Sequence, residues 1–172
     1  FSGNTDTYTL SGNDAEFDAM DLNVGMCEVD YNVGEAYRIK ITYDEEMTRP
    51  DVEIADGVLK ITTSDEYSFS GDDNGFTMKL EITVPEGAEL SKADLTLDAC
   101  QADFTKLDAK DLDVSFDIGE LDFNMLSFET ARFNLNLCDV NIELAGEAAD
   151  YDYDIVNGLG SLTLDGMDLE KA

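Results

Sequence analysis

Acidic side chains that recur at regular spacing are the residues of this sequence with the clearest chemical potential. The chain of 172 residues carries 40 acidic and 10 basic residues, which give a formal net charge of −30. Two sets stand at equivalent outward positions of a repeated pattern: Asp98, Asp117, Asn136 and Asp154, and then Asp103, Asp122 and Asn141. Stacked carboxylates could bind calcium, which takes about six to eight oxygen ligands, or could pair as the acid and base of a glycoside hydrolase.

The calcium interpretation competes with a simpler one, in which the carboxylates form a solvated face that keeps the protein in solution. A calcium site also needs loop carbonyl ligands, and the sequence has neither an EF-hand loop nor a glycine-rich calcium repeat. The best isolated calcium loop by composition is Ser70–Gly75, which a plain turn explains more simply. We therefore favour the solvated face and predict no metal site.

Catalysis has few other candidates. Histidine is absent, which removes the commonest general base, a common zinc ligand and every Ser-His-Asp or Cys-His arrangement. No single pair of carboxylates stands out, and a repeating outward face gives every carboxylate a similar environment. Tryptophan, a common platform for sugars, is also absent, while Tyr31, Tyr151 and Tyr153 fall on inward positions. We predict no catalytic residue, no cofactor and no enzyme activity.

The three cysteines share one position of the repeat, without a CxxC spacing. Cys100 and Cys138 belong to copies that are two steps apart, about 9.6 Å, which is beyond the reach of a disulfide. Cys27 could approach Cys100 only if its strand stacks directly on the copy that begins at Leu95. We predict free thiols that fill a tight corner of the core, with Cys27–Cys100 as the pair to check.

A repeated unit in the C-terminal half of the sequence positions the acidic side chains and the cysteines. Copies beginning at Leu95, Val114 and Phe133 start 19 residues apart, and a fourth begins at Tyr151 with four extra residues around Gly158 and Gly160. A period near twenty with strict alternation inside each copy indicates a solenoid built from strands. We predict two inner columns: Leu95, Val114, Phe133 and Tyr151, and then Leu97, Phe116, Leu135 and Tyr153.

The second copy predicts where the chain turns. Its inward set is Leu112, Val114, Phe116, Ile118, Leu121, Phe123 and Leu126. The alternation breaks for two residues, Gly119 and Glu120, between Ile118 and Leu121. A break at the same place in every copy predicts a corner, where the chain passes from one sheet face to the next.

The N-terminal half holds one further copy and a different pattern. Leu22, Met26, Cys27 and Val29 match Phe133, Leu137, Cys138 and Val140, so residues 17–35 are predicted to form a first coil. Residues 36–84 alternate around an Asp56-Gly57 turn, which predicts antiparallel hairpins. The best helix candidate, Asp14–Met20, is short. We expect one all-β domain over residues 1–172: a short single-stranded parallel β-solenoid, with coils over 93–165, and an antiparallel N-terminal hairpin region.

The repeat form apolar-x-apolar-x-x-Gly-acidic-apolar, as in VSFDIGEL from Val114, resembles the bacterial putative-adhesin domains of unknown function. In that family a coil motif ending Ser-Gly-Asp-Val recurs on a parallel β-solenoid behind N-terminal hairpins. The resemblance spans about residues 17–164, but only Gly119 keeps the motif glycine, which Cys27, Cys100 and Cys138 replace. Cysteine tolerates positive φ poorly, so we expect less sharp corners there. The resemblance implies a location in the bacterial envelope or outside the cell.

Charge and hydropathy exclude several classes of binding partner. Such an acidic surface repels phosphate backbones and anionic lipid headgroups, and no stretch reaches the roughly 18 apolar residues of a membrane span. The chain begins at Phe1 without a methionine, which suggests that a signal or anchor was removed or, equally, that the domain was cut from a longer protein. We predict a non-catalytic surface or secreted module that binds or scaffolds an extended protein or polysaccharide. A sensor domain on a membrane anchor is the alternative.

Overall fold

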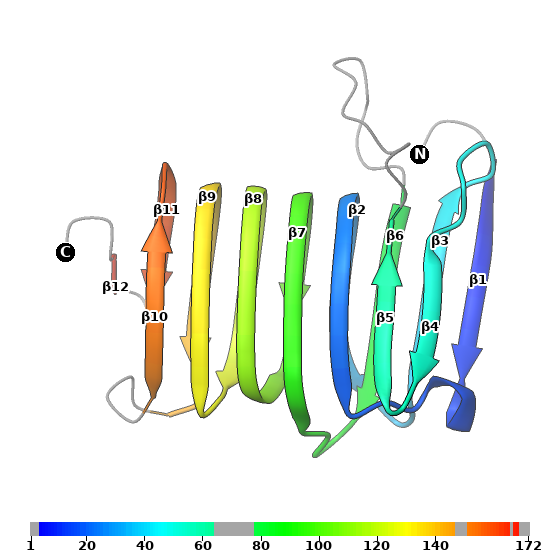
Figure 1. The fold of residues 1–172 in the computed structure, drawn as a ribbon, viewed down its shortest axis with the longest axis horizontal. Coiled ribbons are helices and arrows are strands. Elements are labelled where there is room, and N and C mark those ends of the chain that lie inside the picture. Colours follow the sequence, from blue (N-terminus) through cyan, green and yellow to red (C-terminus); the bar gives the residue numbers. More distant parts are fainter. Residues whose placement is uncertain (1–3, 64–77, 147–150, 166, 169–172) are drawn as a thin grey trace.

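The protein, seen here as a computed structural model that describes residues 4–63, 78–146, 151–165 and 167–168, is all-β with a mixed sheet (Figure 1). One short 3-10 helix, η1 (Gly12–Ala15), precedes the long strands. The strands are β1 (Thr5–Ser11), β2 (Ala19–Gly34), β3 (Arg38–Asp44), β4 (Asp51–Ala55), β5 (Val58–Thr62), β6 (Met78–Pro85), β7 (Leu90–Phe104), β8 (Leu107–Ser127), β9 (Thr130–Leu144), β10 (Asp152–Asn157), β11 (Gly160–Leu164) and β12 (Met167–Asp168).

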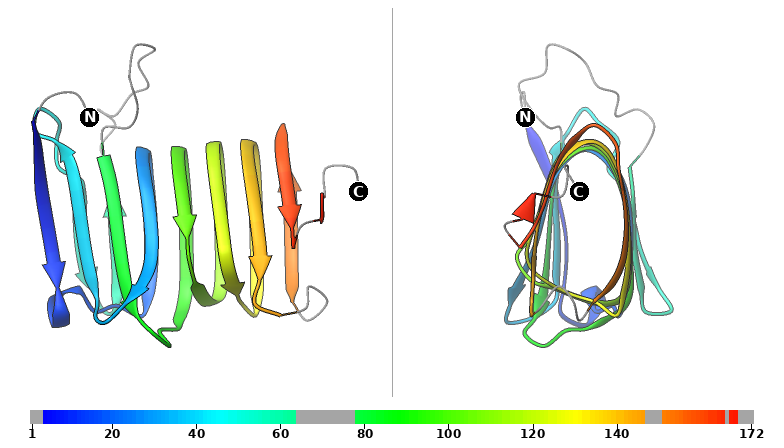
Figure 2. Two further views of the ribbon diagram at one scale, coloured as in Figure 1. Left: turned by 180° about the vertical axis from the view of Figure 1, so that it is seen from behind. Right: turned by 90° about the vertical axis from the view of Figure 1, so that its left-hand side faces the viewer.

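The long strands β2, β7, β8 and β9 bend near their middle, so that the sheet folds over into two walls (Figure 2). The front wall comprises β4, β5, β10 and the halves of the long strands before the bend. The back wall comprises β1, β3, β6, β11, β12 and the halves after the bend. The pairing of β9 shows this division, because its first half pairs with β10 and its second half with β11. One cluster of buried apolar side chains fills the space between the walls.

The predicted 19-residue register is confirmed for the long strands. Leu95 pairs with Val114 and Val114 with Phe133, and the N-terminal copy joins the same column through Leu22. All four side chains are buried. The alternation thus positions the inner face correctly, because a slip of one residue would have turned these apolar side chains to solvent.

The register predicted for the fourth copy is wrong. Ile155, and not Tyr151, lies opposite Phe133, while Tyr153 lies opposite Ala131 instead of Leu135. The offset from β9 is 22 residues on both β10 and β11, so the extra residues precede β10 and do not surround Gly158 and Gly160. The predicted and observed registers differ by four residues. An even shift leaves the in-and-out alternation unchanged, so the alternation could not distinguish them.

The bend begins earlier than predicted. Ile118 was expected to point inward, but it is 43% exposed, and the equivalent Leu137 is 50% exposed. The other six members of the predicted inward set are buried. The chain therefore leaves the front wall directly after Phe116. Positive φ angles also occur at Met26 (54°) and Ala99 (53°), each one residue before the cysteine, so the bends of β2 and β7 use left-handed backbone without the motif glycine.

The N-terminal strands are only partly antiparallel, which corrects the prediction for residues 36–84. The β4–β5 hairpin turns at Asp56-Gly57 as expected, with φ of 52° and 79°, and β3 pairs antiparallel with both β1 and β6. However, β5 and β6 pair in parallel with the two halves of β2. Period-two alternation is the same in parallel and antiparallel strands, so it could not reveal this. The loop Ser70–Gly75 lies outside the described residues.

Aromatic side chains of neighbouring strands pack against one another along the back wall and reach Phe133 on the front wall. Tyr31, Phe104 and Phe123 follow one another with ring centroids 5.6 Å and 5.0 Å apart, and Phe133 meets Phe123 edge-on at 6.3 Å. Each such pair contributes about 0.5–1.5 kcal/mol beyond the burial of its area. This packing holds neighbouring strands in a fixed register, and a fixed register aligns the outward side chains into rows.

Candidate binding surface on the front wall

Outward side chains of the front wall form three rows that cross β7, β8, β9 and β10. Because the strands are parallel and in register, neighbours within a row stand about 4.8 Å apart. The rows are Lys92, Asp111, Thr130 and Asp152; then Asp94, Asp113, Arg132 and Asp154; then Thr96, Ser115, Asn134 and Val156. Most of these side chains are short, so the wall is a regular polar surface.

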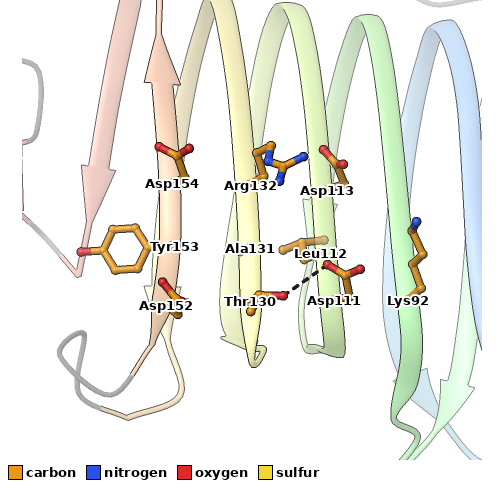
Figure 3. A pocket seen from close by; sticks show the side chains of 10 residues that line it. All are labelled: Lys92, Asp111, Leu112, Asp113, Thr130, Ala131, Arg132, Asp152, Tyr153 and Asp154. Atoms are coloured by element: carbon orange, nitrogen blue, oxygen red, sulfur yellow. Dashed lines mark hydrogen bonds between the residues drawn. The ribbon is translucent and has the colours of Figure 1, made fainter.

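Two grooves lie on this surface, one on each side of the middle of the wall. The lower groove, far from the bend, has a volume of about 430 Å³ and is lined by the ten residues labelled in Figure 3. They include the whole first row, the second row without Asp94, and Tyr153. The upper groove, next to the bend, has about 400 Å³ and is lined by Asn23, Thr96, Leu97, Asp98, Ser115, Phe116, Asp117, Asn134 and Asn136. Both grooves run across several strands.

The lower groove combines both signs of charge. Its cations are Lys92 on β7 and Arg132 on β9, and the guanidinium of Arg132 extends toward Asp113 (Figure 3). Among the residues that the structure describes, ion pairs form between Lys79 and Glu81, Lys106 and Glu86, and Lys110 and Glu89, so neither groove cation takes part in one. Arg132 nevertheless stands between two carboxylates, since Asp113 and Asp154 lie opposite it on the neighbouring strands.

Hydrogen bonds within a row, from one strand to the next, hold several outward side chains of the front wall in place. The Thr130 hydroxyl donates to Asp111 Oδ1 at 3.3 Å, and the Asn136 amide donates to Asp117 Oδ1 at 2.7 Å. Partial burial raises the pKa of Asp98, and its hydrogen bond with Asp117 raises it further. The predicted acidic column is thus confirmed from Asp98 to Asn136. It was wrong for Asp154, which pairs with Arg132 instead.

Repulsion within the second row affects Asp94. Partial burial raises the pKa of Asp94, the carboxylates of Asp21 and Asp113 on the adjacent strands raise it further, and Lys92 opposes them. These causes are those of a row of like charges. They are not those of an acid and base pair with unlike surroundings, which glycoside hydrolysis would need.

The back wall carries the second predicted acidic row. Asp103 pairs with Asp122 and Asp122 with Asn141, as expected. The row continues through Asp30 and Glu81 on the N-terminal side, so four acids stand side by side without a cation between them. Burial raises the pKa of Asp122, and the charge of Asp103 adds to the shift. Over the described residues, no group of three or more acidic or cysteine side chains could hold a metal ion.

The cysteines occupy one column at the bend, as predicted. Cys27 lies beside Cys100, Gly119 follows, and Cys138 comes next. All three are free and buried, and the Sγ atoms of Cys27 and Cys100 are 3.5 Å apart in a thiol hydrogen bond. That hydrogen bond, together with burial, raises the pKa of Cys27 well above its usual value. Burial raises the pKa of Cys138 too, so these thiols are poor nucleophiles.

The tyrosines are placed differently from one another. Tyr31 is buried as predicted, and burial raises the pKa of its phenol strongly. Tyr151 is half-buried and donates to the carbonyl of Ala145 at 2.9 Å. Tyr153 was expected to point inward; it stands opposite the buried Ala131 but is 37% exposed. It is among the residues that line the lower groove, and its ring extends from β10 to the side away from Arg132 (Figure 3).

Sequence reasoning missed Lys92, Arg132 and Tyr153 as members of one groove. A signal was present for the first two, because Arg132 follows Asp113 at the 19-residue offset and Lys92 precedes Asp111 at the same offset. Both therefore had to stand at outward positions of the rows. Nothing local marked Tyr153, because it stands at an inward register position opposite the buried Ala131, and among the described strands its own strand β10 pairs only with β9.

Solved structures resemble this fold at low sequence identity. A putative cell adhesion protein from Clostridium sporogenes matches with a TM-score of 0.65 and 17% identity, over 94% of this chain and 98% of that chain. A putative adhesin from Parabacteroides distasonis matches with a TM-score of 0.49 and 15% identity, over 95% of this chain and 75% of that one. The likeness of fold rests on the Clostridium protein, and at this identity it extends to the fold alone.

A family match is more extensive than these structural likenesses. No curated protein matches the chain. Within the described residues, no helix has the length and apolarity that a membrane crossing requires. Residues 16–172 match the family described as putative auto-transporter adhesin, head GIN domain. Since this match covers most of the chain, and the repeat had indicated the same kind of domain, the protein belongs to that family of putative adhesin domains.

Proposed function

We propose that this chain is a non-catalytic cell-surface module that binds an extended polymer along its front wall. The observation that carries the proposal is the pair of adjoining grooves, both on one wall and both built from rows that cross several strands. In the same proposal the 172 residues form one domain, and the folded-over sheet is a short parallel β-solenoid that ends in antiparallel strands.

The regular spacing of the rows supports a polymeric ligand. A row repeats its side chains every 4.8 Å or so, and stacked repeats offer long surfaces suited to extended partners. The family description as an adhesin agrees with a binding role at the cell surface. A small molecule would need one enclosed pocket, whereas these grooves are open and lie next to each other on one surface.

The same regularity argues against an enzyme. A hydrolase that uses two carboxylates needs one raised and one ordinary pKa in distinct surroundings. On the front wall, the pKa values of Asp94 and Asp98 are both raised, and in each case burial and a neighbouring carboxylate in the same kind of row are the causes. The buried thiols offer no alternative nucleophile.

A blocking substitution on each wall tests the proposal. Ser115 is exposed in the upper groove, and Gln101 is exposed on the back wall, so Ser115→Trp and Gln101→Trp are matched changes. Affinity gel electrophoresis would use gels that hold soluble polysaccharides or polypeptides. We expect that at least one polymer retards the wild type and the Gln101→Trp variant but no longer retards Ser115→Trp. Retardation by no polymer, or equal loss in both variants, would reject the proposal.

A further inference from the structure

We infer that the polymer of the front wall is a neutral polysaccharide. This inference rests on the proposed function and adds the chemical class of the ligand. It follows from the kinds of groups in the lower groove, from the positions of its two cations and from the contrast with the back wall.

Anionic polymers do not fit the lower groove. Its charged lining holds four carboxylates against two cations, and Arg132 has a carboxylate beside it on each neighbouring strand, Asp113 and Asp154. The chain as a whole carries a net charge of −30, which repels a polyanion before contact. Acidic polysaccharides and nucleic acids are therefore disfavoured.

Cationic polymers fit the back wall better than the front. On the front wall a chain that crosses the strands would meet Lys92 on β7 and Arg132 on β9. On the back wall the row from Glu81 through Asp30 and Asp103 to Asp122 is acidic without interruption. A basic peptide would accordingly collect on the back wall, which holds neither of the two grooves described above.

Neutral hydroxyl groups match the remaining chemistry. A hydroxyl both donates and accepts hydrogen bonds, so it can accept from Lys92 or Arg132 and donate to a carboxylate such as Asp111. Thr130, in the lower groove, and Ser115, in the upper one, can do both. Because the groove provides donors and acceptors side by side, successive hydroxyls of a sugar chain can be satisfied without any net charge on the ligand.

Order and shape favour the same class of ligand. Short side chains lose little conformational entropy on binding, and Thr130 is already held by its hydrogen bond to Asp111. The volume of about 430 Å³ lies within the range of about 300–1,000 Å³ that is usual for small-ligand sites, so it can accept sugar units of a longer chain.

The test compares neutral and charged polymers on the folded full-length chain. The probes are dextran, glucomannan and arabinoxylan as neutral polysaccharides, polygalacturonate as a polyanion and poly-L-lysine as a polycation, each in affinity gels at low and high sodium chloride. We expect retardation by at least one neutral polysaccharide that changes little with salt, because no counterions are released when a neutral chain binds.

Two substitutions then locate the binding. Arg132→Gln should weaken binding of the neutral polysaccharide about tenfold, the loss expected when a hydrogen bond to a charged group is removed. The matched back-wall variant Asp103→Asn should leave that binding unchanged and should weaken any salt-sensitive retention on poly-L-lysine. Circular dichroism and thermal melting of both variants would show that each remains folded.

The possible failures are distinguishable. The protein could be retarded only by gels that hold poly-L-lysine or polygalacturonate, and Ser115→Trp could abolish that retardation. In that case the inference of a neutral polysaccharide is overturned, while the polymer-binding function stands. If no polymer of any charge retards the protein, the inference and the proposed function are both overturned. Neutral binding that Arg132→Gln leaves intact but Asp103→Asn abolishes would overturn the assignment to the front wall.

Discussion

The front and back walls share one backbone register and one core, yet they present different chemistry to solvent. On the front wall the acidic residues are interrupted by Thr130, Arg132 and other short polar side chains. On the back wall the row from Glu81 to Asp122 is acidic throughout. The comparison teaches that the fold fixes only the spacing of the outward positions. Which wall can hold a ligand is decided by the residues at those positions.

The largest expected effect tests whether the two walls truly share a core. Phe116 faces inward from the front wall and Phe123 from the back wall, and both are buried. Either Phe116→Asp or Phe123→Asp should cost more than about 4 kcal/mol of unfolding free energy, because a carboxylate replaces packed aromatic surface. Urea denaturation would measure it, with Ser115→Asp as the exposed control. A stable fold for only one core variant would contradict a shared core.

The next effect concerns the bend that joins the walls. Gly119 has a φ of 132°, and a Cβ there would stand 1.9 Å from the carbonyl oxygen of Cys100. Gly119→Ala should therefore lower the free energy of unfolding by about 3 kcal/mol. Gly87→Ala is the control, because Gly87 has a φ of 85° but open space around its Cβ, and its cost should be about 1 kcal/mol. Equal costs would show that the backbone contact is unimportant.

Lowering the pH from 7 should stabilise both walls. Asp94 and Asp98 on the front wall and Asp122 on the back wall have raised pKa values in the folded protein. The folded state then binds more protons than the unfolded state as pH falls, so the free energy of unfolding rises from pH 7 toward about 4, the usual pKa of aspartate. Thermal melting at pH 7, 6 and 5 would measure this.

The variants Asp98→Asn and Asp122→Asn divide the pH effect between the walls. Each should raise the Tm at pH 7 and reduce the gain in Tm on acidification, because the raised pKa it removes no longer contributes. A Tm that stays flat or falls between pH 7 and pH 5 in the wild type would show that these rows do not strain the folded state.

Salt should have a smaller effect that differs between the walls. Carboxylates about 4.8 Å apart repel by roughly 0.9 kcal/mol at the dielectric constant of water, and the screening length falls from about 30 Å at 0.01 M salt to 10 Å at 0.1 M. Added sodium chloride should therefore raise the Tm. Asp103→Asn should reduce this salt dependence more than Asp113→Asn, since Asp113 has Arg132 beside it. The reverse order would contradict the difference in charge between the walls.

The smallest expected effect is on the thiols at the bend. Cys27, Cys100 and Cys138 are buried between the walls, and the pKa values of Cys27 and Cys138 are raised. A thiol reagent should modify none of them in the native protein and three per chain in denaturant without reductant. Rapid modification of the native protein would mean that the bend opens. A count of one reactive thiol per chain in denaturant would mean that Cys27 and Cys100 had formed a disulfide.

The sequence alone determined the features that depend on alternation and on equal spacing. It predicted an all-β chain, the column from Leu95 to Phe133, the cysteine column and the acidic row from Asp103 to Asn141. The family resemblance followed from the same repeat. These features could be predicted because burial of every second residue must be satisfied within each strand, and a constant offset keeps neighbouring strands in step.

Only the tertiary structure decided the features that depend on partner strands. Alternation cannot detect an even shift, so it could not place Ile155 opposite Phe133, and it could not show that β5 and β6 run parallel to β2. The exposure of Ile118 depends on where the wall ends. The lower groove depends on all of these, because Lys92, Arg132 and Tyr153 come together only when the four strands β7, β8, β9 and β10 are stacked in one register. The physical reason is that strand pairing is non-local, whereas alternation is a property of one strand.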